Sequence, residues 1–541
     1  MLEMYQPKKL TMLDSISKLS SVDVAPGSVS HPPSTRRFPS NVPDFLLEGK
    51  SSDQVALLLL EGERTYGELQ SAANDVAKYL VRTGGRTGDR VILFSENSFF
   101  WIASYLGILR AGMACVPLPV ATVSREIDYI LQMTEARFAF LQVGFAAANA
   151  ARFSQTSVVV DRELPDSCAL HAVSFASVRS LSAGNIATLP TVNADDLAAL
   201  MFTSGSTGRP RGVMISHRNI MANTESIIHY LGLTQRDRIM TVLPFHYCFG
   251  TSLLHTHLRV GGSLVIDSRF MYPEKVLQRM HETQCTGLAG VPSHYQILLR
   301  RSTIREMNFP NLRYVQQAGG HLAPSFIREL RAALPGTQIF LMYGQTEATA
   351  RLSYLPPEEV DTKLGSIGKA IPGVKLEVLD ERGRGVDPGG LGEIVAEGEN
   401  IAGGYWRDPR SSAKSFRNGK LYTGDIATVD RDGFIYIMGR AKDFLKCGGK
   451  RVSCRQIEEQ LLEFEGLLEA AVIGVPDLIL GEAVKAFVVP RDGSSNELEK
   501  SLRLFCKEHM PSQFVPREVV IVDSIPRNSA GKLFKPALKT I

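Results

Sequence analysis

Apolar and amphipathic stretches alternate along most of the chain. Apolar runs typical of buried strands and amphipathic stretches typical of helices follow one another at residues 55–60, 65–83, 90–95, 99–110 and 115–118. Thr65, with Glu68 three residues later, is typical of a helix N-terminus, because the two side chains can cap each other's backbone amides. This alternation predicts an α/β fold in which parallel sheets are covered by helices.

The two ends of the chain differ from its bulk. Residues 1–40 are rich in Ser and Pro, which predicts a flexible N-terminal segment. The chain of 541 residues is too long for one compact core. We therefore predict a large N-terminal domain at residues 41–440 and a small α+β C-terminal domain at residues 441–541.

Composition restricts the partners and the compartment. A net charge of +4 on a chain of this length gives no reason to expect a nucleic-acid partner. The seven cysteines are scattered and lack metal-ligand spacing, so we expect free thiols in a reducing cytoplasm. Residues 1–20 have no apolar core fit for a signal peptide and no run reaches about 18 apolar residues, so we expect neither a signal peptide nor a membrane span.

A loop rich in glycine and small hydroxyl residues separates the apolar run at residues 197–202 from another at residues 213–215. Glycines let the backbone approach a ligand, successive amides can form an anion-binding nest, and arginines add positive charge. The loop is therefore either a polyphosphate site or a surface turn. It is not the P-loop of nucleoside triphosphatases, because Pro210 stands where that pattern requires glycine. The residues predicted to bind phosphate are Thr203, Ser204, Gly205, Ser206, Thr207, Gly208 and Arg211.

This loop resembles the phosphate loop of the adenylate-forming superfamily, which comprises acyl- and aryl-CoA synthetases, peptide-synthetase adenylation domains and beetle luciferases. Arg211 replaces the lysine of the usual family pattern, so its planar fork would position phosphate differently. The resemblance covers about residues 50–540. It implies a large N-terminal domain of two α/β subdomains plus a β subdomain, followed by a small mobile α+β C-terminal domain.

The segment that ends in Tyr343, Gly344, Gln345, Thr346 and Glu347 matches the family pattern Tyr-Gly-x-Thr-Glu completely. Taken alone, the glutamate would be a solvated acid at a helix start. The resemblance implies instead that it holds Mg²⁺ against the phosphates, that the threonine contacts phosphate, and that the tyrosine lies near the adenine.

Two further segments are assigned to the nucleotide by the resemblance. Gly319 and Gly320 fall where family members contact adenine, although His321 replaces the usual proline. Asp425 belongs to a Thr-Gly-Asp turn whose carboxylate accepts hydrogen bonds from the ribose hydroxyls in the family. Arg440 would be a second contact to ribose or phosphate. Residues 365–369, 391–394 and 403–406 are expected to have only a structural role in a β-rich region.

The C-terminal motifs concern movement and the second reaction step. Lys532 lies in a pattern that matches the catalytic lysine of the superfamily, which bridges the carboxylate and the α-phosphate. Lys442 falls at the family hinge. Gly448 and Gly449 resemble the loop that lines the thiol tunnel.

The segment around residues 243–250 resembles the acid-binding region of acyl- and aryl-activating members. His246, Phe249 and Gly250, together with Gly320, are the predicted substrate pocket, and the histidine is a predicted catalytic residue with Thr346, Glu347 and Lys532. Amino-acid-activating members need a carboxylate here to pair the buried ammonium. Residues 241–265 contain no Asp or Glu, so we expect an acid without an α-amino group.

The implied reaction is ATP- and Mg²⁺-dependent formation of an acyl-AMP, followed by transfer of the acyl group to a thiol. CoA is the expected acceptor. A stand-alone enzyme that loads the phosphopantetheine of an acyl carrier protein is the alternative, and a nucleotide-binding protein with weakened catalysis, prompted by Arg211, is another.

Overall fold

The computed structural model describes residues 39–182, 188–203, 210–440, 444–447, 450–477, 481–491, 496–511, 514–527 and 533–540. The predicted flexible segment falls almost wholly outside these ranges. Some predicted site residues also lie outside the described residues: Ser204, Gly205, Ser206, Thr207, Gly208, Lys442, Gly448, Gly449 and Lys532.

A seven-stranded sheet forms the first α/β subdomain, in the order β7-β6-β5-β3-β4-β8-β9. Its strands are parallel except for β9, which runs antiparallel to β8. The strands are β3 (Arg90–Phe94), β4 (Ala114–Pro117), β5 (Phe138–Leu141), β6 (Ser157–Val160), β7 (Ala172–Ser174), β8 (Leu197–Thr203) and β9 (Arg211–Ser216). Almost every residue of the central strands is buried, as expected when helices cover both faces.

A nine-stranded sheet forms the second α/β subdomain, in the order β16-β15-β14-β13-β12-β10-β11-β1-β2. Its inner strands are parallel, and antiparallel strands close both edges. The strands are β1 (Val55–Leu59), β2 (Gly62–Thr65), β10 (Arg238–Thr241), β11 (Ser263–Ile266), β12 (Gly287–Gly290), β13 (Tyr314–Gln317), β14 (Gln338–Tyr343), β15 (Ser353–Leu355) and β16 (Lys369–Ala370). The predicted parallel sheets are confirmed.

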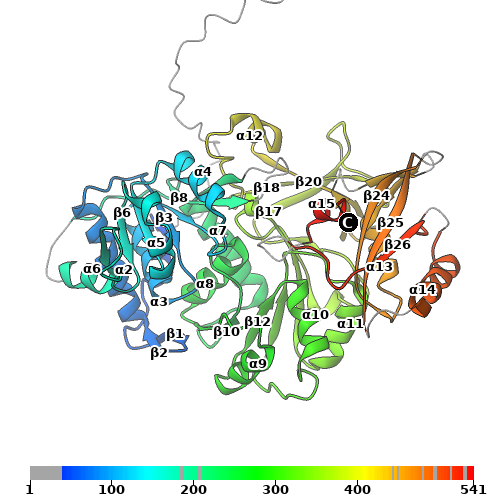
Figure 1. Cartoon of the computed structure of the whole chain (residues 1–541), viewed down its shortest axis with the longest axis horizontal. Helices are drawn as coiled ribbons and strands as arrows, with labels where there is room; N and C mark the ends of the chain where they lie inside the picture. The colour runs from blue at the N-terminus through cyan, green and yellow to red at the C-terminus, as the bar shows by residue number, and fades with distance from the viewer. Residues whose placement is uncertain are drawn as a thin grey trace, which may run out of the picture.

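Helices fill the space between the two sheets and cover their outer faces (Figure 1). The predicted cap is present at α2, where the Thr65 hydroxyl accepts from the Glu68 amide at 3.2 Å and the Thr65 amide donates to the Glu68 carboxylate at 2.8 Å. The helices of the two subdomains are α1 (Val42–Leu47), α2 (Tyr66–Arg82), α3 (Phe99–Arg110), α4 (Ser124–Thr134), α5 (Val143–Ala148), α6 (Phe175–Ser182), α7 (His217–Leu231), α8 (Cys248–Val260), α9 (Pro273–Glu282), α10 (Pro292–Arg301) and α11 (Pro324–Ala333), with 3-10 turns η1 (Ala150–Phe153), η2 (Thr346–Ala348) and η3 (Pro357–Glu359).

Contacts of α3 with α8 and with the segment that precedes α8 join the two subdomains. The Tyr105 hydroxyl and His255 Nε2 lie 2.9 Å apart, and the rings of Trp101 and Phe245 are 5.3 Å apart. All four side chains are at least 96% buried. The interior between the sheets is therefore one continuous core.

An antiparallel five-stranded sheet forms the β subdomain, and a second five-stranded sheet forms the smaller C-terminal domain. The first comprises β17 (Val374–Leu379), β18 (Gly392–Gly398), β19 (Phe416–Arg417), β20 (Lys420–Val429) and β21 (Ile435–Arg440), with α12 (Pro409–Ser415). The second comprises β22 (Phe444–Cys447), β23 (Lys450–Ser453), β24 (Leu467–Asp477), β25 (Gly481–Pro490) and β26 (Glu518–Ile521), with α13 (Cys454–Leu461), α14 (Asn496–His509) and α15 (Lys535–Leu538). The predicted division at residues 440–441 falls between β21 and β22 and stays a prediction.

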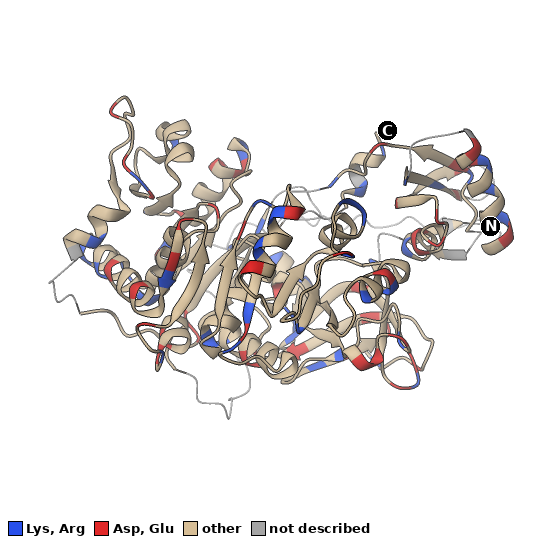
Figure 2. Cartoon of the chain, turned by 90° about the horizontal axis from the view of Figure 1, so that it is seen from below, with Lys and Arg blue, Asp and Glu red and all other residues tan. Residues whose placement is uncertain are grey.

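Acidic and basic residues are interspersed along the helices of the chain (Figure 2). Among the helices that the structure describes, none combines the length and the apolar character that crossing a membrane requires.

Candidate functional site

The described candidate residues lie on the loop after β13, the loop between β14 and β15, the start of α8, the β8–β9 hairpin, and strands β20 and β21. Side-chain contacts join the loop between β14 and β15 to α8, and the end of β14 to β20. Parallel strands commonly present binding residues at their carboxyl ends, because the loops there meet at one edge of the sheet.

A carboxylate, a phenol and a guanidinium form the first cluster. The Tyr343 hydroxyl donates to one oxygen of Asp425 at 2.6 Å, and Arg440 Nε donates to the other at 3.1 Å. Asp425 and Arg440 are direct partners in the antiparallel pairing of β20 with β21, and this register brings their side chains together. Asp425 is 7% exposed, and its charge raises the pKa of Arg440. Since each carboxylate oxygen can accept more than one hydrogen bond, the cluster still has acceptor capacity for a diol.

The second cluster surrounds Glu347. The Tyr405 hydroxyl donates to its carboxylate at 2.8 Å, and the Arg211 guanidinium lies 4.4 Å from the centre of the Tyr405 ring. Burial, then Glu347, raises the pKa of this phenol, which stays neutral. Tyr405 belongs to residues 403–406, for which the sequence predicted only a structural role, and its hydroxyl orients a predicted catalytic carboxylate.

The donor chemistry around Glu347 fits a hard cation. A carboxylate and the Thr346 hydroxyl are oxygen ligands of the kind that Mg²⁺ prefers. Among the described residues, no group of three or more His, Cys, Asp or Glu side chains gathers as a metal cluster. A magnesium ion here would therefore take its other ligands from phosphates and water.

Two predicted site glycines are required by backbone packing. A Cβ on Gly344 would lie 2.0 Å from the carbonyl oxygen of Ala350, and a Cβ on Gly250 would lie 2.1 Å from that of Pro244. Gly319 has a φ of +83°, which favours glycine. A Cβ on Gly320 would meet only the ring of Pro292, at 3.1 Å. The glycines at 250 and 344 thus have a sufficient structural explanation without a ligand contact.

The predicted acid-binding segment lies at the start of α8. Burial lowers the pKa of His246 to about 4, so that its imidazole is neutral near pH 7. Phe249, which is 7% exposed, lies against the guanidinium of Arg351 at 4.1 Å from ring centroid to Cζ. Cys248 Sγ lies 3.6 Å from the hydroxyl of Thr346. The acid-binding segment is thus in direct contact with the predicted catalytic loop.

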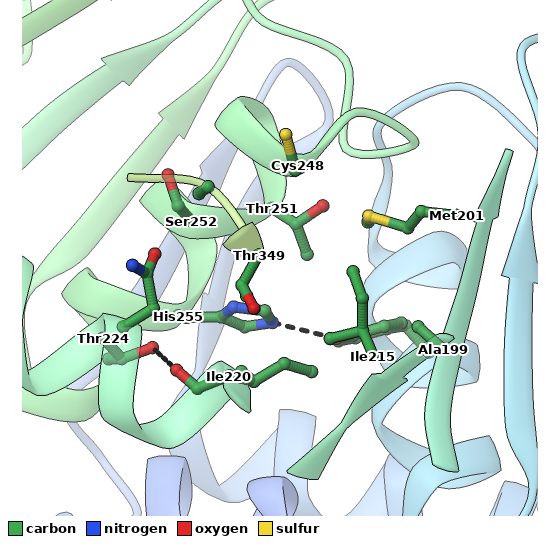
Figure 3. Close-up of a pocket in the computed structure, with 13 residues that line it drawn as sticks. Ala199, Met201, Ile215, Ile220, Thr224, Cys248, Thr251, Ser252, His255 and Thr349 are labelled. Carbon is green, nitrogen blue, oxygen red and sulfur yellow. Dashed lines mark hydrogen bonds between the residues drawn. The ribbon is translucent and has the colours of Figure 1, made fainter. Parts of the chain in front are cut away.

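A small cavity lies beside this segment, between α3, α7, α8 and the loop after η2 (Figure 3). Its volume is about 10 Å³, room for about one water molecule. Hydroxyl and ring groups mix with apolar side chains on its wall, which includes Tyr105, Asn223, Cys248, Thr251, His255 and Ala350.

His321 connects the candidate site to the C-terminal domain. Its Nε2 lies 2.7 Å from a carboxylate oxygen of Glu459, and Arg455 donates to its Nδ1; both partners lie on α13. Arginine has no acceptor, so the Nδ1 atom must be unprotonated and the ring neutral. Burial, reinforced by Arg455, lowers the pKa of His321 accordingly. The sequence shows that a histidine replaces the proline usual in the family. It does not show this contact between the domains.

Comparisons with known proteins cover nearly the whole chain. Residues 48–406 match the family of AMP-binding enzymes, and residues 456–532 match the AMP-binding enzyme C-terminal domain. A probable CoA ligase of Humulus lupulus is 30% identical over 488 residues, which cover 89% of this chain and 92% of that relative. An oxalate–CoA ligase of Arabidopsis thaliana is 29% identical over 475 residues, 87% of this chain and 91% of its own. The fold is similar to that of an anthranilate CoA ligase in complex with anthranoyl-AMP, with a TM-score of 0.85, 26% identity, and coverage of 92% of this chain and 96% of the other.

Proposed function

Since the chain belongs to the adenylate-forming superfamily of AMP-binding enzymes, we propose that it joins a carboxylic acid without an α-amino group to the thiol of CoA at the expense of ATP. The chain is an acid–thiol ligase of the AMP-forming type. The relatives above act on acids as different as oxalate and anthranilate, so the class of acid must come from this chain's own pocket.

The cluster of Tyr343, Asp425 and Arg440 is the observation that carries this proposal. A buried carboxylate, fixed through both oxygens and next to an exposed guanidinium, is suited to a ribose diol with a phosphate beside it. We assign Asp425 to the ribose hydroxyls and Arg440, whose side chain is 52% exposed, to ribose or phosphate. Gly319, Gly320 and the Tyr343 ring would lie along the adenine.

In the first step, a carboxylate oxygen of the acid attacks the α-phosphorus of ATP, the bond to the β-phosphate breaks, and pyrophosphate leaves. His246, neutral near pH 7, would hydrogen-bond the acid. Arg211, with Thr203 and the loop between them, would contact the phosphates, and Lys532 would neutralise charge on the carboxylate and α-phosphate. These residues act by positioning and by charge stabilisation.

Glu347 and Thr346 would hold the magnesium ion, which supplies charge neutralisation for the phosphates when bound. Tyr405 fixes the orientation of Glu347 from one side. The Arg211 guanidinium packs on the ring of the same tyrosine, so the positions of Glu347 and Arg211 both depend on Tyr405.

In the second step, the thiol sulfur attacks the acyl carbon, its proton is lost to solvent, and the bond from the acyl carbon to AMP breaks. We propose that rotation about Lys442 brings Gly448 and Gly449 towards the acyl-AMP in place of Lys532. This rotation would be gating and not chemistry.

Pyrophosphate release from ATP and Mg²⁺ should be measured over a panel of fatty, aryl and amino acids, with and without CoA. We expect release with a class of acid that lacks an α-amino group, together with AMP and an acyl-CoA product. Transfer to a purified holo-carrier protein but not to CoA would replace CoA as the acceptor. No release with any acid and either acceptor would contradict the proposal.

A further inference from the structure

Arg351 carries a buried positive charge that the described part of the fold does not neutralise. Arg351 is one of the largest fully buried side chains of the described residues, with a relative exposure of 1%. Among the described residues, no Asp or Glu forms an ion pair with it or acts on its charge. Burial of an ion without a counter-charge is strongly unfavourable, so an arginine in this position requires an explanation.

The hydrogen-bond partners of the guanidinium among the described residues are all neutral groups. Arg351 Nε points at Met342 Sδ at 3.4 Å, and Nη1 reaches the carbonyl of Ala350 at 3.4 Å. Its Nη2 is buried and has no hydrogen-bond partner. The guanidinium also hydrogen-bonds the side chain of Tyr230. Burial raises the pKa of this phenol to about 12, so it is neutral and supplies no counter-charge. Nη2 is therefore the donor for which the described residues supply no hydrogen-bond acceptor in good geometry.

The guanidinium lies beside the predicted acid-binding segment. Phe249 packs on its face at 4.1 Å. Cys248, the next residue on α8, lies 3.6 Å from the Thr346 hydroxyl and also contributes to the electrostatics of Arg351. Two successive residues of α8 therefore contact the guanidinium on one side and the loop at which the acid would be activated on the other. Cys248 and Ala350 also line the cavity of Figure 3, so the wall of that cavity adjoins the same segment.

The backbone that presents Arg351 is strained and firmly held. Thr349 has φ 65° and ψ −54°, the conformation of a γ-turn, which the Ala350 amide closes by donating to the carbonyl two residues earlier at 2.7 Å. The carbonyl of Arg351 accepts from Asn223 Nδ2 at 3.2 Å and from Asn400 Nδ2 at 2.8 Å. Strain of this kind persists where the surroundings over-determine the conformation, and it is concentrated at functional sites.

We propose that Arg351 binds a second carboxylate of the acid substrate, which makes short dicarboxylic acids the preferred substrates. This inference rests on the proposed function and names the substrate class of that same site. A guanidinium recognises a carboxylate through parallel charge-assisted hydrogen bonds, and the partner-free Nη2 supplies such a donor. The spacer is short because Phe249, which packs on the guanidinium, is the neighbour in sequence of Cys248, whose sulfur lies 3.6 Å from the Thr346 hydroxyl.

The first experiment compares acids of matched size on the wild-type enzyme. Malonate, succinate and glutarate are each assayed against their monomethyl esters for CoA-thioester formation. We expect kcat/KM for at least one diacid to exceed that of its half-ester on the order of 100-fold, because the ester leaves the buried guanidinium unpaired. Equal or faster turnover of the half-ester at every chain length would overturn the proposal.

Arg351→Met removes the charge at similar length. We expect the diacid-to-half-ester ratio to fall to about 1, with half-ester turnover retained and no decrease in Tm, because an unpaired buried charge is removed. Arg351→Lys keeps the charge without the fork and should give an intermediate ratio. If Arg351→Met lowers kcat/KM for the diacid and for the half-ester by the same factor and also lowers Tm, the role of Arg351 is merely structural.

Arg300→Met is the matched control, since Arg300 is also largely buried at 13% exposed but is paired with Glu329, away from the candidate site. It should lower Tm and leave the substrate ratio unchanged. The half-ester comparison needs no variant, so it tests the proposal even if Arg351→Met does not fold. If monoacids give thioesters as well as diacids do, only the assignment of Arg351 fails; if no acid releases pyrophosphate, the proposed function itself fails.

Discussion

Tyr343 and Asp425 are joined by a hydrogen bond of 2.6 Å that connects the end of β14 to β20. The bond ties the loop of the predicted catalytic residues to the carboxylate assigned to ribose. Asp425 is buried and Tyr343 is partly buried, so the phenol fixes the carboxylate with little competition from water.

Tyr343→Phe removes this hydrogen bond and keeps the ring. A hydrogen bond to a charged group contributes about 1.5–3 kcal/mol, which corresponds to a rise of about tenfold or more in the KM for ATP. The KM for the acid should change little. Initial rates at varied ATP check this, and an unchanged KM for ATP would remove Tyr343 and Asp425 from the nucleotide site.

Tyr405→Phe should weaken magnesium binding while keeping the aromatic ring on which Arg211 packs. Outer partners of metal ligands typically contribute about 10- to 100-fold in metal affinity or activity. We therefore expect a higher Mg²⁺ requirement in the pyrophosphate-release assay. Tyr405→Leu also removes the ring under Arg211 and should in addition raise the KM for ATP. Identical magnesium titrations of wild type and Tyr405→Phe would contradict the role assigned to the phenol.

Gly344→Ala should destabilise the N-terminal domain, because the new Cβ would lie 2.0 Å from a backbone oxygen that cannot move freely. Overpacking of this kind costs about 1–3 kcal/mol. Thermal melting of the variant should show a lower Tm than wild type. Gly144→Ala is the control: this glycine lies in α5 with open space around it, so Tm should stay the same or rise slightly. Equal Tm values for Gly344→Ala and wild type would refute the packing argument.

The contact of His321 with Glu459 and Arg455 should weaken on acidification. Burial, then Arg455, lowers the pKa of His321, so the folded protein binds fewer protons there than the unfolded chain. This contribution to stability is present above the ordinary histidine pKa of about 6.5 and is lost as the pH falls below it. Burial raises the pKa of Glu459, but His321 and Arg455 outweigh it and hold the value at about 2, so its own contribution is lost only at still lower pH.

Melting curves from pH 8 to pH 5.5 measure this effect on wild type and on His321→Asn. The Tm of wild type should exceed that of the variant at pH 8, and the difference should shrink below about pH 6.5. Parallel Tm curves for the two proteins would show that the histidine does not couple the domains in this way.

The sequence determined the architecture and the identity of most candidate residues. Alternating apolar runs predicted the strands of the two parallel sheets, and Thr65 with Glu68 predicted the cap of α2, because both signals are local and depend only on neighbours in the chain. Ordered motifs around 203, 343 and 425 placed the chain among adenylate-forming enzymes before any contact was known.

The tertiary structure alone decided which distant side chains act on those motifs. Tyr405 lies 58 residues from the glutamate it binds, and His321 lies 134 residues from Arg455. No sequence motif singles out Arg351, and only its burial without an acidic partner among the described residues makes it informative. The physical reason is that burial and charge pairing depend on residues brought together by folding, which local pattern and composition do not encode.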